Sequence, residues 1–205
     1  MMYSMYSVFS KSFFIHSQET TMTRGIRNNN PLNIRHSADQ WQGMRANQTD
    51  PSFVQFESMA YGYRAAWKVL ESYWNHFEQV GKLFNARNII ARWAPPTEND
   101  TEAYFRTVLW LSGVGGNETF PKPSRGTGYG RLEVLLRAMT TVECGIPYDK
   151  VDVGAIRQGF HLAFPGVLKK KRKELQPKVP VDVNISKLPS QQGTTFAAWD
   201  EYWDW

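Results

Sequence analysis

The sequence predicts an α+β protein that is mostly helical, with one small antiparallel sheet near its N-terminal end. Several segments repeat apolar residues at three- and four-residue spacing, as amphipathic helices do. Short runs between residues 32 and 56 instead alternate apolar and polar residues, as half-buried strands do. Strands grouped at one end of the chain and helices after them are typical of the α+β class.

The sheet is expected from three short runs, at residues 32–35, 41–44 and 53–56. The helical period begins at residue 58, where Ser58 is the expected cap, and continues to residue 80, before Gly81. A second helix is expected around Ile89 and Trp93, ending at the Pro95-Pro96 pair. Three more are expected at residues 101–112, 132–142 and 153–164.

The 205 residues divide into three predicted regions. Residues 1–22 form a flexible N-terminal tail, residues 23–165 a folded domain, and residues 166–205 a basic linker with an aromatic C-terminal anchor. The N-terminal tail makes no convincing signal peptide, since no basic residue precedes its first apolar patch, and either Met1 or Met22 can be the start. No transmembrane segment is expected.

A net charge of +5 and a pI near 9.3 favour an anionic partner, such as a cell-wall polymer, nucleic acid or a membrane surface. Nucleic acid is the weakest of these, because the basic run at residues 169–173 is not interleaved with aromatic residues. The terminal segment, residues 196–205, is acidic and aromatic, which is typical of a peptide that docks onto a groove of its own domain or of a partner.

A polar loop is predicted at residues 24–35, Arg-Gly-Ile-Arg-Asn-Asn-Asn-Pro-Leu-Asn-Ile-Arg. Three asparagines before Pro31 do not suit a helix interior, because their short amides compete for nearby backbone groups. The loop is therefore expected to be held in one shape by its side-chain amides. An ordinary Asx turn that enters a hairpin accounts for the same residues equally well.

The residues of this loop, together with Trp41-Gln42-Gly43, resemble the opening of a family of phage and prophage proteins. Members of that family are catalogued as virion structural proteins or lysozyme-like domains. The asparagine-rich turn is also similar to that of lysozyme-like glucosaminidases and lytic transglycosylases. Residues 53–56 with 61–65, and 92–101 with Tyr104, strengthen the resemblance.

The resemblance implies a lysozyme-like fold and a phage or prophage protein that cleaves peptidoglycan by general acid catalysis. Such a protein is virion-associated or exported to the cell envelope, and its C-terminal tail contacts virion or capsid proteins. The alternative is an inactive virion structural or wall-binding protein of the same fold. The expected substrate-binding residues are Asn28, Asn29, Asn30, Asn33, Arg35, Trp41, Trp93 and Tyr104.

Glu98 and Asp100 are the predicted catalytic carboxylates, since they follow two prolines that fix the backbone and precede a helix. Helix capping explains the same residues, and a helix N-terminus lowers a carboxyl pKa, whereas a general acid needs it raised. Lysozyme-like enzymes carry their glutamate shortly before the asparagine-rich turn, and Glu19 is the only acid in that position here.

No metal and no cofactor is expected. His16, His36, His76 and His161 show no metal-ligand spacing, and the glycine-rich segment 113–130 lacks the Gly-Lys-Ser/Thr of a phosphate-binding loop. Cys144, which precedes Gly145, is expected to be a small buried residue and not a nucleophile.

Overall fold

The structure is a computed structural model that describes residues 22–97 and 100–167. Almost all of the predicted N-terminal tail and the predicted C-terminal linker and anchor therefore lie outside the described residues. The helices are α1 (Arg24–Arg27), α2 (Met59–Gln79), α3 (Ala86–Trp93), α4 (Thr101–Ser112), α5 (Tyr129–Cys144) and α6 (Val153–Ala163), with short 3-10 helices η1 (Pro123–Arg125) and η2 (Tyr148–Lys150).

The five helices predicted from the apolar period are confirmed as α2 to α6. Three of them begin at a side chain that accepts a hydrogen bond from a backbone N–H of the first turn, Asn85 for α3, Asp100 for α4 and Asp152 for α6. Ser58 precedes α2 as expected, but its side chain makes no capping hydrogen bond.

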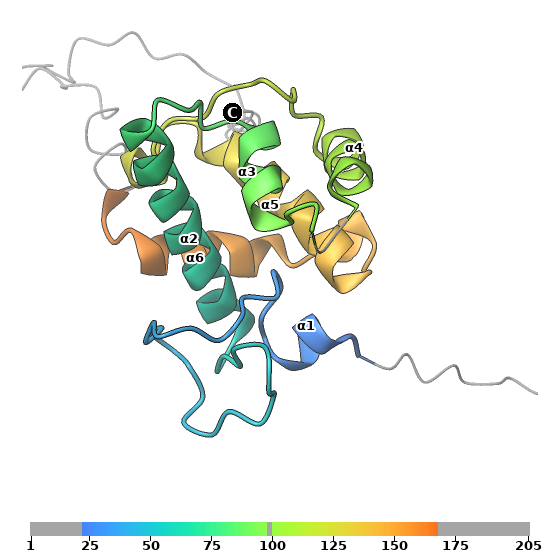
Figure 1. Cartoon of the computed structure of the whole chain (residues 1–205). Helices are drawn as coiled ribbons and strands as arrows, with labels where there is room; N and C mark the ends of the chain where they lie inside the picture. The colour runs from blue at the N-terminus through green and yellow to red at the C-terminus, as the bar shows by residue number, and fades with distance from the viewer. Residues whose placement is uncertain (1–21, 98–99, 168–205) are drawn as a thin grey trace, which may run out of the picture.

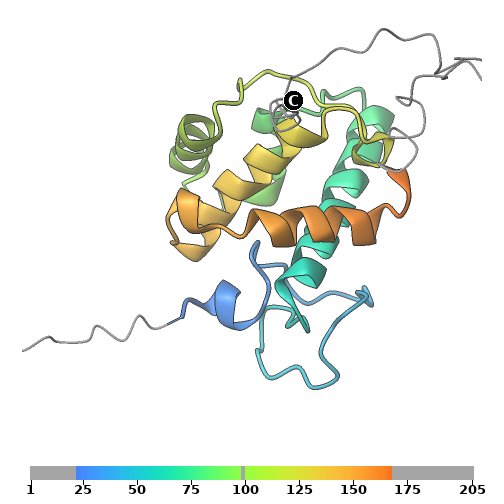
Figure 2. The same ribbon diagram turned by 180° about the vertical axis from the view of Figure 1, so that it is seen from behind.

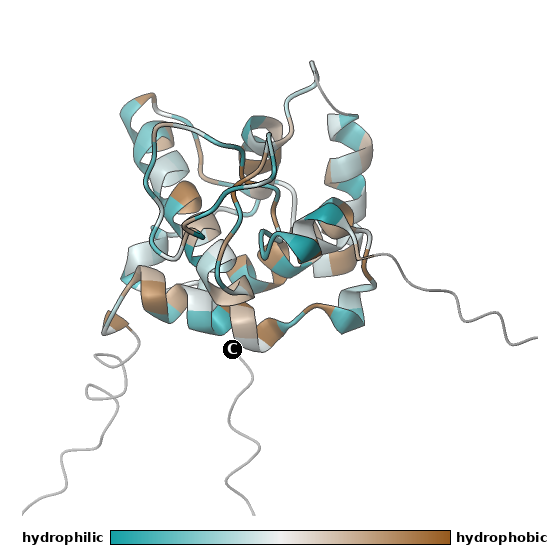
Figure 3. Cartoon of the chain, turned by 90° about the horizontal axis from the view of Figure 1, so that it is seen from below, coloured by the Kyte–Doolittle hydropathy of each residue, from teal (hydrophilic) through white to brown (hydrophobic). Residues whose placement is uncertain are grey.

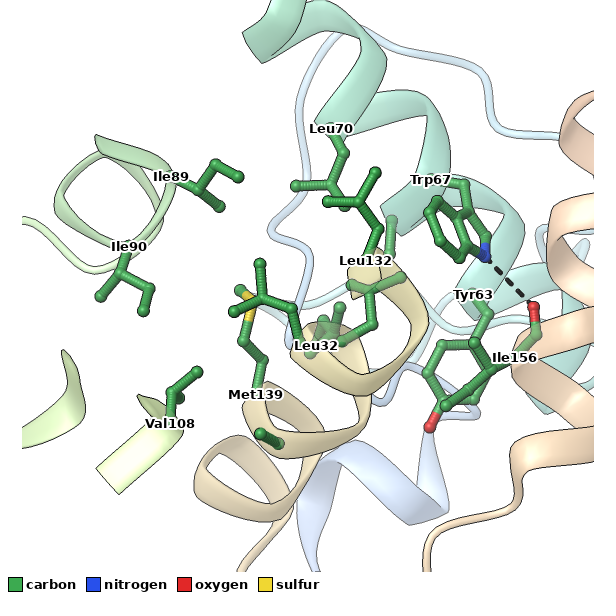
Figure 4. Close-up of a cluster of buried hydrophobic side chains, with 14 of the residues drawn as sticks. Leu32, Tyr63, Trp67, Leu70, Ile89, Ile90, Val108, Leu132, Met139 and Ile156 are labelled. Carbon is green, nitrogen blue, oxygen red and sulfur yellow. Dashed lines mark hydrogen bonds between the residues drawn. The ribbon is translucent and has the colours of Figure 1, made fainter. Parts of the chain in front are cut away.

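The core is built from buried side chains of α2 to α6, and α6 crosses α2 (Figures 1 and 2). Trp67 of α2 is fully buried and its Nε1 donates to the carbonyl of Ile156 in α6 at 3.1 Å (Figure 4). The ring of Phe160 meets Trp67 edge-on, with the ring centroids 5.1 Å apart. Burying these aromatics stabilises the packing of the helices by about 2 kcal/mol for each side chain.

The predicted antiparallel sheet is wrong, and with it the α+β, lysozyme-like fold class. The described residues are helical and contain no strand. The three predicted strand segments are joined only by isolated antiparallel bridges, Arg35 with Phe53 and Met44 with Phe56. A third isolated bridge joins Asn85 to Thr119.

Side-chain amides replace the ladder that the alternating residues predict. Asn30 is fully buried, and its Nδ2 donates to the carbonyls of Ile34 and Val54, both at 2.8 Å. Its Oδ1 accepts from the amide of Ile34 at 2.9 Å. Because one side chain takes hydrogen bonds that strand pairing would use, the two segments lie side by side without extending into a sheet.

The connection between α1 and α2 carries mainly hydrophilic residues where it crosses the end of the helical body (Figure 3). Within the described ranges, no helix has the length and apolar character needed to cross a membrane. The same ranges contain no group of three or more His, Cys, Asp or Glu side chains placed to hold a metal ion.

Candidate functional site

The asparagine loop, residues 28–33, is rigid because each of its asparagine side chains is hydrogen-bonded. Asn28 is 1% exposed and donates to Asp50 at 2.7 Å, while Asn29 donates to the carbonyl of Phe56 at 3.0 Å. Asn29 and Asn33 adopt φ angles of 52° and 48°, a left-handed conformation that asparagine tolerates better than most residues. The prediction that side-chain amides hold this loop is confirmed.

The loop packs directly on α2 at Gly62. A Cβ atom at this position would lie 2.2 Å from the carbonyl oxygen of Asn29 and 2.6 Å from Cδ of Pro31. Glycine therefore allows the backbone of the loop to approach the helix, which fixes where the loop sits relative to the core.

Glu143, in the last turn of α5, is the carboxyl group around which the loop and the helices meet. Asn33 Nδ2 donates to its Oε2 at 2.9 Å, and the Tyr104 hydroxyl, from α4, donates to its Oε1 at 3.0 Å. The side chain of Trp93, at the end of α3, adds a further hydrogen bond. Asn33 Nδ2 also donates to the backbone carbonyl of Glu143 at 3.2 Å. The loop therefore hydrogen-bonds to both the side chain and the main chain of Glu143.

Burial raises the pKa of the Glu143 carboxyl above its ordinary value, and the hydrogen bonds from Asn33, Tyr104 and Trp93 oppose that rise. Its place at the negative end of the α5 dipole acts in the same direction as burial. Burial also raises the pKa of the Tyr104 phenol well above its usual range, which keeps Tyr104 a hydrogen-bond donor. Glu143 as a residue is half-buried.

Three of the predicted substrate-binding residues, Asn33, Trp93 and Tyr104, thus gather at one carboxyl group. Asn28, Asn29 and Asn30 hold the loop instead, through the bonds given above. The other two predicted residues lie on the connection to α2. Arg35 places its guanidinium 5.3 Å from the centroid of Phe53, and the half-buried Trp41 packs against the hydrophobic core.

Of the two predicted catalytic carboxylates, the structure describes only Asp100. Asp100 is exposed and caps α4 by accepting from the amide of Ala103 at 2.9 Å, which is the capping role weighed against catalysis. Glu98 lies outside the described residues, as does Glu19. Cys144 is buried, which confirms the prediction of a small buried residue. Burial raises the pKa of its thiol to about 12, which disfavours the thiolate that a nucleophile requires.

Sequence reasoning missed Glu143, although one signal pointed to it. An acidic residue in the last turn of a helix faces the negative end of the dipole, an unfavourable position unless a specific contact compensates. Glu143 stands directly before Cys144 and Gly145, the residues that mark the end of α5. A carboxylate in that position is therefore expected to have hydrogen-bond donors or burial that compensate for the unfavourable dipole.

A separate pocket of about 410 Å³ lies beside α1, with Arg24, Arg27, Asn28 and Asp50 among its lining residues. Glu143 does not line it. Glu143 is distinguished instead by the environment of its carboxyl group, since burial and hydrogen bonds tune its pKa as proton transfer requires.

No family model matches this sequence. The chain is 35% identical over 159 residues to a protein named Protein P5 of Pseudoalteromonas phage PM2, and the match covers 73% of this chain and 88% of that protein. The relative is a bacteriophage protein, which fits a phage origin for this chain.

Proposed function

We propose that this chain, which belongs to the family of Protein P5 from Pseudoalteromonas phage PM2, is a phage protein that cleaves cell-wall glycan. Glu143 is the general acid in this proposal, in place of Glu98 and Asp100. Asn33 and Tyr104 position the carboxyl group, and Trp93 borders it. The environment of Glu143 is the single observation that carries the proposal.

A glycosidic bond breaks when an acid protonates the departing oxygen. An ordinary surface glutamate has already lost its proton at neutral pH, so a general acid requires a raised pKa. Burial of the Glu143 carboxyl supplies that rise, while the residue as a whole is not fully buried. A tryptophan beside the acid is suited to pack against a sugar ring.

The transglycosylase route needs one acid, because a hydroxyl of the substrate itself closes on the sugar. Glu143 is sufficient for that route, whereas hydrolysis often employs a second carboxylate. We therefore favour a lytic transglycosylase reaction on peptidoglycan. The resemblance of residues 24–35 to the asparagine-rich turn of such enzymes agrees with this choice, although the fold expected from that resemblance was wrong.

Peptidoglycan is then the principal partner, and the excess positive charge of the chain suits an anionic wall polymer. A phage protein of this kind acts either as part of a virion or at the cell envelope. Contact with virion or capsid proteins through residues 166–205 belongs to this proposal, and almost all of that region lies outside the described residues.

The second candidate function is an inactive virion structural or wall-binding protein. One observation favours it: the hydrogen bonds from Asn33 and Tyr104 to Glu143 link the loop, α4 and α5, and that linkage stabilises the fold whether or not any substrate binds.

A zymogram on purified cell walls separates the two functions. The proposal requires that the wild type clears the wall and that Glu143→Gln does not. Glu78→Gln is the matched control, since Glu78 is an exposed glutamate in the last turn of α2, and Asp100→Asn tests the residue first predicted. Circular dichroism of each variant shows that it is folded.

Clearing by Glu143→Gln at the wild-type rate would overturn the role of that residue. If neither the wild type nor any variant clears the wall, the inactive structural function is correct.

A further inference from the structure

The pocket beside α1 is lined by buried polar side chains that already bond to one another. Asn28 donates to Asp50 at 2.7 Å, and Gln55 Nε2 donates to Asn28 Oδ1 at 3.1 Å. Gln55 Oε1 accepts from the amides of Thr49 and Asp50 at 2.6 and 3.2 Å. These groups form a fixed wall, and a ligand must be recognised by other atoms.

Arg24 is one source of such atoms. Its Nε and Nη2 donate to the two carboxylate oxygens of Asp50 at 2.7 and 2.6 Å, and the guanidinium lies 4.5 Å from the centroid of the Phe53 ring. The side chain is still 42% exposed. It is therefore held in one orientation while part of it faces solvent, so little conformational freedom is lost when it binds a ligand.

Arg27 is the second source. It follows Arg24 by three residues within α1, a spacing that places two side chains on the same face of a helix. Arg27 is exposed and lines the pocket. In the part of the chain that the structure describes, the ion pairs involve other cations, and no carboxylate pairs with the Arg27 guanidinium.

The charges in the pocket favour a ligand with one negative charge. Two guanidiniums and one carboxylate leave one net positive charge. Asp50 repels such a ligand little, because its oxygens already accept from Arg24, Asn28 and the amides of Ser52 and Phe53. Carboxylate and phosphate both match a planar guanidinium. A carboxylate carries the single charge that this pocket neutralises, whereas a phosphate would leave the occupied pocket with a net negative charge.

We propose that this pocket binds a free carboxylate of the peptides attached to wall glycan, with Arg27 as the main contact and Arg24 as the second. The choice of a wall peptide depends on the proposed function, since cleavage of wall glycan would bring such peptides to the protein. The pocket would then hold the wall polymer while Glu143 acts on the glycan.

Isothermal titration calorimetry tests the site without requiring cleavage. The probe is the soluble stem peptide released from purified cell walls, and the comparison probes are the same peptide with its carboxylates amidated and inorganic phosphate. The proteins are the full chain, Arg27→Gln, Arg27→Lys and Arg106→Gln. Arg106 is an exposed arginine on α4 and gives the same loss of charge elsewhere.

We expect Arg27→Gln to weaken binding of the stem peptide by about tenfold or more, because one charge-assisted hydrogen bond is lost. Arg27→Lys should bind at an intermediate level, and Arg106→Gln should bind as the wild type does. The proposal is overturned if Arg27→Gln binds normally, if the amidated peptide binds equally well, or if phosphate binds more tightly than the peptide.

The two proposals fail in different ways. Peptide binding that depends on Arg27, without any clearing of the wall, would leave a wall-binding site on an inactive protein. Clearing that depends on Glu143, without peptide binding that depends on Arg27, would remove this site alone.

Discussion

Asn33 Nδ2 lies 2.9 Å from Oε2 of Glu143, although 110 residues of chain separate them. The contact joins the asparagine loop to the end of α5 and brings a left-handed asparagine to a carboxyl group with a raised pKa. Changes to either residue therefore affect both the fold and the proposed chemistry.

Replacing Asn33 separates these two effects. Asn33→Gly keeps the φ of 48° without strain and removes the side-chain donor. Because that donor lowers the pKa of Glu143, its loss should raise the pKa further, as a carboxyl-carbon NMR titration would show. Asn33→Ala loses the same donor and adds about 1 kcal/mol or more of backbone strain, so it should melt at a lower temperature than Asn33→Gly. Equal melting temperatures for the two variants would contradict this account.

Glu143 should make the protein less stable as the pH rises. Its folded-state pKa is raised above the ordinary value of 4.5, so the folded protein holds this proton more tightly than the unfolded chain does. The stability that Glu143 gains from this tighter proton binding is complete below pH 4.5 and is lost as the pH rises through the folded-state pKa. Melting temperatures measured from pH 4 to 8 should therefore show the wild type losing stability relative to Glu143→Gln as the pH rises. A constant difference across the range would show that the pKa is not raised.

Asp50 should give the opposite dependence. Arg24 bonds its carboxylate, and with Asn28 and two backbone amides it holds the pKa of Asp50 far below the ordinary 3.8. Its contribution to stability is present above pH 3.8 and is lost as the pH falls towards the depressed folded-state pKa. Asp50→Asn should melt well below the wild type at pH 7, and the difference should shrink in acid. Asp39→Asn, at an exposed position, should show little difference at either pH.

Gly62→Ala tests the contact between the asparagine loop and α2. The added Cβ would lie 2.2 Å from the Asn29 carbonyl oxygen, so the loop must move away from the helix. We expect roughly 1–3 kcal/mol of destabilisation from overpacking, and reduced wall clearing because Asn33 moves with the loop. Gly115→Ala is the control, since the nearest atom to its Cβ is 3.5 Å away. Chemical denaturation measures both variants, and a stable Gly62→Ala would contradict the close packing.

The sequence by itself determined the helices. The spacing of residues such as Tyr63, Trp67 and Leu70 reports which side of α2 faces the core, because the period of a helix is a local property. The sequence also indicated that amides hold the asparagine loop, since Asn30 and Pro31 exclude a helix there for local steric reasons. The alternation at residues 32–35 and 53–56 predicted strands, and this prediction was wrong. Alternation shows that every second side chain is buried, but it does not show which groups the backbone bonds to. Asn30 supplied the hydrogen-bond partners instead.

The tertiary structure alone decided which acid is surrounded by the predicted site residues. Asp100 looked suitable in the sequence and is a helix cap, whereas Glu143 is distant in sequence from the asparagine loop that it contacts. The pKa of a carboxyl group depends on what desolvates it and what donates to it, and here those groups come from Asn33, Trp93 and Tyr104 on three other segments. No periodic pattern in the sequence predicts that these side chains surround Glu143, because they come together only when the helices pack.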